Sequence, residues 1–145
     1  KVSSKNKVDK EIVLGTNSLF ISITYDKDSD TWIFHFADNI IFHILIWRLL
    51  KENQIVLVSF ENGHQFGLPK PVNVVEEMTA IINWQLLLEI KIKKDTADLM
   101  LTLTNNLQVE VFISSRGYES YNIHVGKINY IGMGMGDIAI FNSGT

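Results

Sequence analysis

The sequence contains no cysteine among its 145 residues, which excludes disulfide bonds and thiolate metal sites and makes a reducing cytosol its natural setting. It also lacks a long apolar run. The longest one, residues 40–50, is interrupted by His43 and Arg48 and is much shorter than a bilayer-spanning helix. Both absences favour a soluble, cytoplasmic protein that has no membrane segment. Hydrophobic residues make up 46% of the chain and charged residues 20%, which is typical of a globular protein with a substantial core.

Basic residues are scarce outside the N-terminus. The net charge is −3, but Lys1, Lys5, Lys7 and Lys10 all lie within the first ten residues, so that residues 11–145 hold 9 basic and 15 acidic side chains, a balance of −6. Nucleic-acid binding needs a basic face to neutralise phosphates, and we therefore expect no nucleic-acid partner. An acidic body suits a basic protein partner, although the need for solubility explains the same charge.

Apolar and polar residues alternate over three successive runs, Trp84–Ile92, Leu99–Thr104 and Leu107–Ile113. A period of two is typical of strands that are buried on one face. Asn105 and Asn106 separate the last two runs, and Asn tolerates the positive φ of a two-residue hairpin turn. This stretch predicts a three-stranded antiparallel meander around which the rest of the chain is organised.

The remaining sequence predicts one domain rich in strands. Residues 1–10 have no periodicity and are expected to form a flexible arm, with residues 11–145 as a single domain. The run over residues 40–50 predicts one strand buried on both faces. Residues 72–82 show the only helical spacing. We expect an α+β fold, with eight to ten strands in a twisted antiparallel sheet or partly closed barrel and one amphipathic helix packed on it.

One acidic segment resembles the start of a calcium-binding loop but does not continue as one. Asp26, Asp28 and Asp30 have the spacing of its first three ligands. The sixth position is Thr31, where glycine is needed, and the twelfth is Ala37, where a bidentate glutamate is needed. The segment therefore predicts a hairpin turn.

Other motifs for cofactors and catalysis are incomplete. Gly132, Gly134 and Gly136 are spaced G-x-G-x-G and precede a strand, which predicts a tight turn rather than a dinucleotide site. None of the four histidines has the spacing of a helical metal motif, and we expect no metal, no cofactor and no catalytic residues. His64 is the only histidine in an irregular loop, and an enzymatic alternative would place a hydrolase site around His64 and Glu119.

The second half of the chain carries a family likeness. The segments Asn106–Phe112 (N-L-Q-V-E-V-F), Tyr118–Tyr121 (Y-E-S-Y) and Gly134–Ala139 (G-M-G-D-I-A) follow Trp47-Arg48 and the loop Gly63–Gly67. This order resembles a family of small uncharacterised bacterial immunity-like proteins, in which an "N-G-x-x-L-E-V-F" hairpin precedes "Y-E-S-W" and a glycine-rich turn. The likeness covers residues 40–141. Here Tyr121 replaces the family's tryptophan, and Asn106 stands where glycine is common.

The resemblance implies a non-enzymatic immunity protein that binds and neutralises a cognate toxin domain, such as a basic nuclease, by occluding it. We expect Glu61, His64, Glu119 and Tyr121 to lie exposed near one edge and to contact the partner. Arg48 lies within an apolar run, where a guanidinium must reach solvent or pair with a carboxylate, so we expect a structural ion pair or a position at a sheet edge. In an alternative to the partner contact of Glu119, Arg48 and Glu119 pair with each other and orient this site.

A second interpretation is a small-ligand-binding β-barrel. A sheet curled around Trp32, Trp47 and Trp84 would enclose a cavity. An empty apolar interior would favour this alternative, and a filled core would oppose it.

Overall fold

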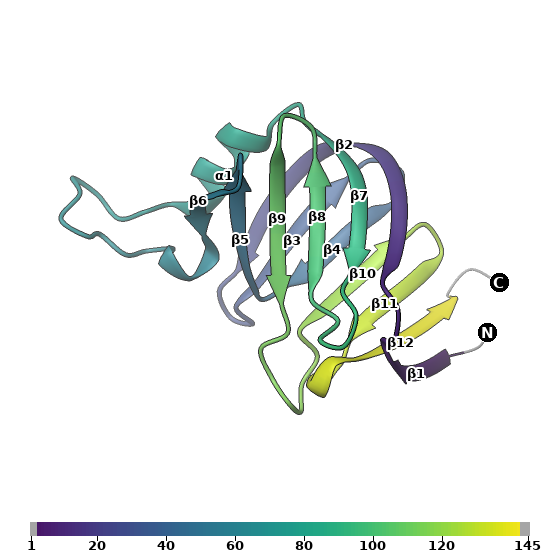
Figure 1. Cartoon of the computed structure of the whole chain (residues 1–145). Coiled ribbons are helices and arrows are strands. Elements are labelled where there is room, and N and C mark those ends of the chain that lie inside the picture. The colour runs from purple at the N-terminus through teal and green to yellow at the C-terminus, as the bar shows by residue number, and fades with distance from the viewer. Residues whose placement is uncertain (1–2, 143–145) are drawn as a thin grey trace.

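A strand of 15 residues, β2 (Ile12–Asp26), belongs to two layers of sheet at once (Figure 1). Its first half pairs with β7, and its second half pairs with β3. A shift in register between Gly15 and Ser18 lies within the first half, where a bulge increases the local twist of a strand. The computed structural model describes residues 3–142, and β2 joins its two layers into one antiparallel sheet of twelve strands.

The strand order is β1-β12-β11-β10-β4-β3-β2-β7-β8-β9-β5-β6, so that β1 and β6 are free edges and the sheet is not closed. The expected α+β fold with one helix is confirmed, as an open sheet and with more strands than expected. Besides β2, the strands are β1 (Ser3–Lys7), β3 (Thr31–Phe36), β4 (Ile40–Ile44), β5 (Ile46–Lys51), β6 (Gln54–Val58), β7 (Leu86–Ile92), β8 (Leu99–Leu103), β9 (Leu107–Phe112), β10 (Tyr121–Val125), β11 (Ile128–Gly132) and β12 (Asp137–Asn142).

The predicted meander is present as β7, β8 and β9, and Asn105 and Asn106 have the positive φ values of 61° and 57° that the turn requires. One detail of its first strand differs from the prediction. The register shifts between Leu87 and Glu89, so that Leu87 points into the core and Leu88 is exposed. The strand begins only at Leu86, and Trp84 is exposed because it precedes the strand in a turn, with a φ of 70°. A bulge of this kind moves each later side chain to the opposite face, and alternation in the sequence does not reveal it.

The prediction of a single strand over residues 40–50 is wrong. The chain bends at Leu45, so that β4 lies in one layer and β5 in the other. In both strands, buried positions alternate with half-buried ones, and the two ends of β5 are exposed. The run appears uniformly apolar because two half-buried strands follow each other with one residue between them.

The expected flexible arm over residues 1–10 contains β1, which pairs with β12 along its whole length. An edge strand offers unpaired backbone N–H and C=O groups, which an extended segment with any side chains can pair with. The polar composition of residues 1–10 therefore gave no sign of this pairing. Lys1 and Val2 lie outside the described residues.

The core lies between the two layers, and Trp47 of β5 is at its centre. Its indole contacts the rings of Trp32 and Phe34 on β3 edge to face, at centroid distances of 5.4 and 5.1 Å. All three side chains are at most 2% exposed. Burial of each ring contributes roughly 1.5–3 kcal/mol, so this contact between layers stabilises the fold strongly.

The helix α1 (Val74–Ile82) packs against β2 and β6 and contributes Val74, Met78 and Ile82 to the core. It begins at Asn73, whose side chain accepts a hydrogen bond from the backbone N–H of Glu76. Its position brings the preceding loop close to the end of β2. Within residues 3–142, no helix has the length and apolar character that crossing a membrane requires.

Candidate functional site

The segment between β6 and α1, residues 59–73, projects away from both layers of the sheet (Figure 1). We call it the projecting loop. It begins with a short 3-10 helix, η1 (Ser59–Glu61), and contains both prolines of the chain. The Ser59 hydroxyl accepts a hydrogen bond from the backbone N–H of Trp47, at 3.1 Å, which anchors the start of the loop to β5.

The projecting loop is held in shape by its own hydrogen bonds. The Gly63 N–H donates to the Val72 carbonyl and the Val72 N–H donates to the His64 carbonyl, each at 2.8 Å, so that the two arms are tied together. At its base, the Asn62 side chain accepts a hydrogen bond from the N–H of Val74, the first residue of α1. Bonds at both ends fix the backbone of the loop to the helix and to the sheet.

Three aromatic side chains lie on this framework and face solvent. Phe60 is 77% exposed and Phe66 is 62% exposed. The imidazole of His64 lies between them, with ring centroids 5.7 Å from Phe60 and 5.3 Å from Phe66. Phe side chains are usually buried, and a cluster of them held outward on a fixed loop is typical of a surface that binds another molecule.

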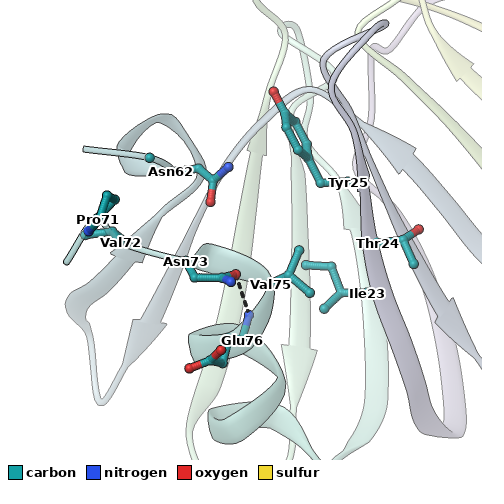
Figure 2. Close-up of a pocket in the computed structure, with 10 residues that line it drawn as sticks. Ile23, Thr24, Tyr25, Asn62, Pro71, Val72, Asn73, Val75 and Glu76 are labelled. Atoms are coloured by element: carbon teal, nitrogen blue, oxygen red, sulfur yellow. Dashed lines mark hydrogen bonds between the residues drawn. The ribbon is translucent and has the colours of Figure 1, made fainter. Parts of the chain in front are cut away.

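A groove of about 750 Å³ runs along the base of the projecting loop. Figure 2 shows its lining residues, which come from three elements: Ile23, Thr24 and Tyr25 from β2; Asn62, Gly63, Pro71, Val72 and Asn73 from the loop; and Val75 and Glu76 from α1. A smaller hollow of about 380 Å³ lies beside it and extends from Leu68 to Glu77. The two hollows share Pro71, Val72, Asn73 and Glu76, so both sides of the loop base are open to a ligand.

Carboxylates outnumber basic groups around this groove. Glu76 lines both hollows and Glu77 lines the smaller one, where Lys70 is the single basic residue. At the other wall, the Tyr25 hydroxyl donates to Asp30 at 2.6 Å. This hydrogen bond, together with burial and the charges of Asp30 and Asp26, raises the pKa of Tyr25 and keeps its hydroxyl protonated. The site is therefore acidic at its rim and aromatic at its tip.

Two of the residues expected to contact a partner, Glu61 and His64, belong to the projecting loop, Glu61 half-buried and His64 exposed. Glu119 is also exposed, but it lies in the loop before β10, on a different side of the molecule (Figure 1). The structure does not bring His64 and Glu119 together as the hydrolase alternative requires. Within residues 3–142, no three His, Asp or Glu side chains come close enough to hold a metal ion.

The expectation that Tyr121 is exposed is wrong. Its side chain is 2% exposed, and its hydroxyl donates to the carbonyl of Ala97 at 2.9 Å. Tyr121 begins β10, and it shares the core face with Ile123 because side chains alternate along a strand. The tyrosine of this segment that faces solvent is Tyr118, at 78% exposure.

Arg48 pairs with Glu110 rather than with Glu119. Its Nε donates to Oε1 of Glu110 at 2.6 Å, because β5 and β9 pair in a register that places these two residues directly opposite each other. The guanidinium also lies over the ring of Phe112, 5.3 Å from its centroid. This contact stabilises the outer face of the sheet and takes no part in the projecting loop.

Sequence reasoning missed Phe60 and Phe66, which carry most of the exposed aromatic surface of the loop. For Phe66 the signal was available, since it lies in a polar segment with glycine and proline that offers no strand or helix face. Phe60 instead follows the apolar run 55–58 and is predicted as the end of that strand, whereas β6 ends at Val58. Comparison of the chain with protein-family models, with curated proteins and with solved structures gives no match. The likeness to immunity proteins therefore stays a prediction.

Proposed function

We propose that this chain is a bacterial immunity protein of the cytosol, which binds a toxin domain and blocks it by occlusion, and that the projecting loop is the centre of the contact. The observation that carries the proposal is the exposure of Phe60, His64 and Phe66 on a loop whose backbone is fixed by hydrogen bonds. Rigid aromatic side chains lose little conformational entropy on binding, and they dominate the energy of many protein interfaces.

The partner that fits this site is a basic protein surface. The groove and the adjoining hollow present Glu76 and Glu77, and neither carboxylate forms an ion pair among the side chains described, those of residues 7–142. Opposite charge accelerates the encounter of two proteins and selects against acidic competitors. A nuclease domain, which must be basic to bind nucleic acid, has this complementary charge.

The test is co-expression of this chain with the protein encoded beside it, followed by measurement of complex formation and of the toxin's activity. We expect a one-to-one complex that abolishes toxicity. Phe60→Ala and Phe66→Ala should each weaken binding by about 30-fold or more, which corresponds to about 2 kcal/mol. The folded state should keep its stability, because both rings are exposed.

Trp84→Ala is the matched control, since Trp84 is as exposed as Phe60 but lies outside the projecting loop. It should leave the affinity unchanged. A complex that forms equally well with Phe60→Ala and Phe66→Ala would show that the contact lies elsewhere. Absence of any complex with the neighbouring protein would refute the proposed role.

The open sheet removes the main support for a ligand-binding barrel. Such a protein needs a closed wall around an empty interior, whereas the two edges of this sheet stay apart and the rings of Trp32, Phe34 and Trp47 pack between its layers. The hollows at the projecting loop are open grooves on the surface. They suit a protein surface better than an enclosed small molecule.

A further inference from the structure

One of the two free edges of the sheet, the strand β6, leads directly into the projecting loop. β6 has β5 as its one neighbour in the sheet, and it ends immediately before η1, which contains Phe60. Figure 1 shows β6 at the margin of its layer, with the projecting loop leaving from the end of the strand. A strand added to this edge would therefore lie beside the loop.

The backbone groups of Ile55 point away from the sheet. The N–H of Glu52 donates to the carbonyl of Asn106, just before β9, at 3.0 Å. Because backbone groups alternate in direction along a strand, Leu50 also points its N–H and C=O toward β9 and not toward β6. Ile55 is directly opposite Leu50, so its own N–H and C=O face outward. Among residues 3–142, no group beyond this edge forms a hydrogen bond to them.

The side chains of β6 do not protect the edge against a further strand. The strand contains neither a charged residue nor a proline, and Ile55 and Val56 are 53% and 44% exposed. Free edges in soluble proteins are commonly protected by lysine or proline, which oppose strand addition. The other free edge fits this rule, since β1 contains Lys5 and Lys7. The edge at β6 is therefore open to an extended segment with apolar side chains.

A bulge limits how much chain can pair with β6. The register between β5 and β6 shifts at Val56, which has no opposite residue on β5, and a bulge of this kind bends the strand and increases its twist. Continuous pairing of two copies through β6 would meet this bend in both strands. A short segment of another protein needs only the part of β6 that precedes the shift. The bulge therefore favours a different protein over a second copy as the occupant of this edge.

We propose that an extended segment of the toxin domain joins the sheet as an added strand beside β6. The inference rests on the proposed function and describes how the two proteins make contact. Hydrogen bonds to the backbone of Ile55 supply one part of the contact, and the aromatic rings of the projecting loop supply the other. Strand addition draws its affinity from main-chain bonds and its specificity from the neighbouring side chains. The segment that fits carries apolar residues beside Ile55 and belongs to a domain with a basic surface.

Hydrogen exchange of the Ile55 amide tests the proposal directly. The measurement compares the free chain with its complex with the protein encoded beside it, using NMR on the isotopically labelled chain. In the free chain this N–H has no partner and should exchange rapidly. In the complex we expect its exchange to slow by about 100-fold or more, because the added strand accepts its hydrogen bond.

Ile55→Pro removes the outward N–H and should weaken binding by about 10-fold or more. The fold should be retained, because proline is tolerated on an edge strand where the N–H faces solvent. Ile55→Thr is the matched control, since threonine keeps both the N–H and the β-branched shape, and it should bind nearly as well as the wild type. Circular dichroism and urea unfolding check that both variants are folded. If Ile55→Pro fails to fold, the exchange of the wild-type amide decides.

The outcomes separate this inference from the proposed function. A complex that abolishes toxicity, while the Ile55 amide exchanges as fast as in the free chain, overturns strand addition and leaves the proposed function standing. Equal weakening by Ile55→Pro and Ile55→Thr also overturns it, because the side chain would then carry the contact. A dimer of the free chain that Ile55→Pro abolishes would assign the edge to a second copy and overturn it. Absence of any complex refutes the proposed function and this inference together.

Discussion

The close approach of β10 to β11 makes Gly132→Ala a sensitive test of the packing. Gly132 is directly opposite Tyr121, and a Cβ atom built on Gly132 would lie no more than 2.7 Å from three carbons of the Tyr121 ring. The ring has no free direction in which to move, because it is 2% exposed and its hydroxyl is bonded to Ala97. The substitution therefore forces either the strands or the ring out of place.

The expected change in the free energy of unfolding combines three effects. Overpacking of a filled core destabilises by roughly 1–3 kcal/mol. Displacement of the ring weakens its buried hydrogen bond to Ala97, which adds about 1 kcal/mol. Replacement of a glycine within a strand stabilises by roughly 0.5–1 kcal/mol, because alanine loses less backbone entropy on folding than glycine does. We expect Gly132→Ala to lower the free energy of unfolding by about 2 kcal/mol.

Urea unfolding followed by tryptophan fluorescence measures this change, with an unchanged m-value showing that the compactness of the denatured state is unaltered. Gly15→Ala in β2 is the control, because no atom lies within 4 Å of a Cβ built there, and it should be neutral or slightly stabilising. In a Tyr121→Ala background, Gly132→Ala should cost far less. Equal effects of Gly132→Ala and Gly15→Ala would refute the reasoning.

Two further predictions concern charged and titrating groups. Arg48→Met leaves the Glu110 carboxylate, which is 13% exposed, with Lys93 at 4.0 Å as its remaining cation. We expect the free energy of unfolding, measured with urea, to fall by roughly 1–2 kcal/mol. Arg116→Met, at an exposed position, is the control and should have no effect. Burial, with the charge of Asp98, raises the pKa of Tyr121 above its ordinary value of 10.0. The neutral Tyr121 hydroxyl therefore contributes stability that is fully present below pH 10 and is lost as the pH rises further. The free energy of unfolding should fall from about pH 10 upward, and Tyr121→Phe should make this decline less steep.

Local sequence signals predicted the parts of the fold that depend on local chemistry. The hairpin at Asn105-Asn106 is confirmed because a positive φ is a property of single residues, and the helix expected over residues 72–82 is confirmed as α1 because its spacing forms one apolar face. The bend at Leu45 and the pairing of β1 with β12 depend instead on which strands are neighbours in space. Neither leaves a mark in the composition of the segments involved.

The candidate site was predictable to a similar extent. Glycine and proline identified the segment around His64 as an irregular loop, and the structure confirms it as a loop that projects from the sheet. The motif around Tyr121 predicts an exposed residue, but the alternation of Tyr121 with Ile123 places both side chains on the buried face of β10. Arg48 forms the expected structural ion pair, but its carboxylate is Glu110 and not Glu119, because the register between β5 and β9 sets the partner.

The stability of the projecting loop does not depend on its exposed rings. Its shape depends on backbone hydrogen bonds at Gly63 and Val72 and on the Asn62 side chain at its base. Phe60 and Phe66 take part in none of these bonds, and both remain largely in water. Two rings that the fold does not need, held outward beside an acidic groove, are the basis of the proposed contact with a partner. This is why substitution of either ring should change binding and leave folding intact.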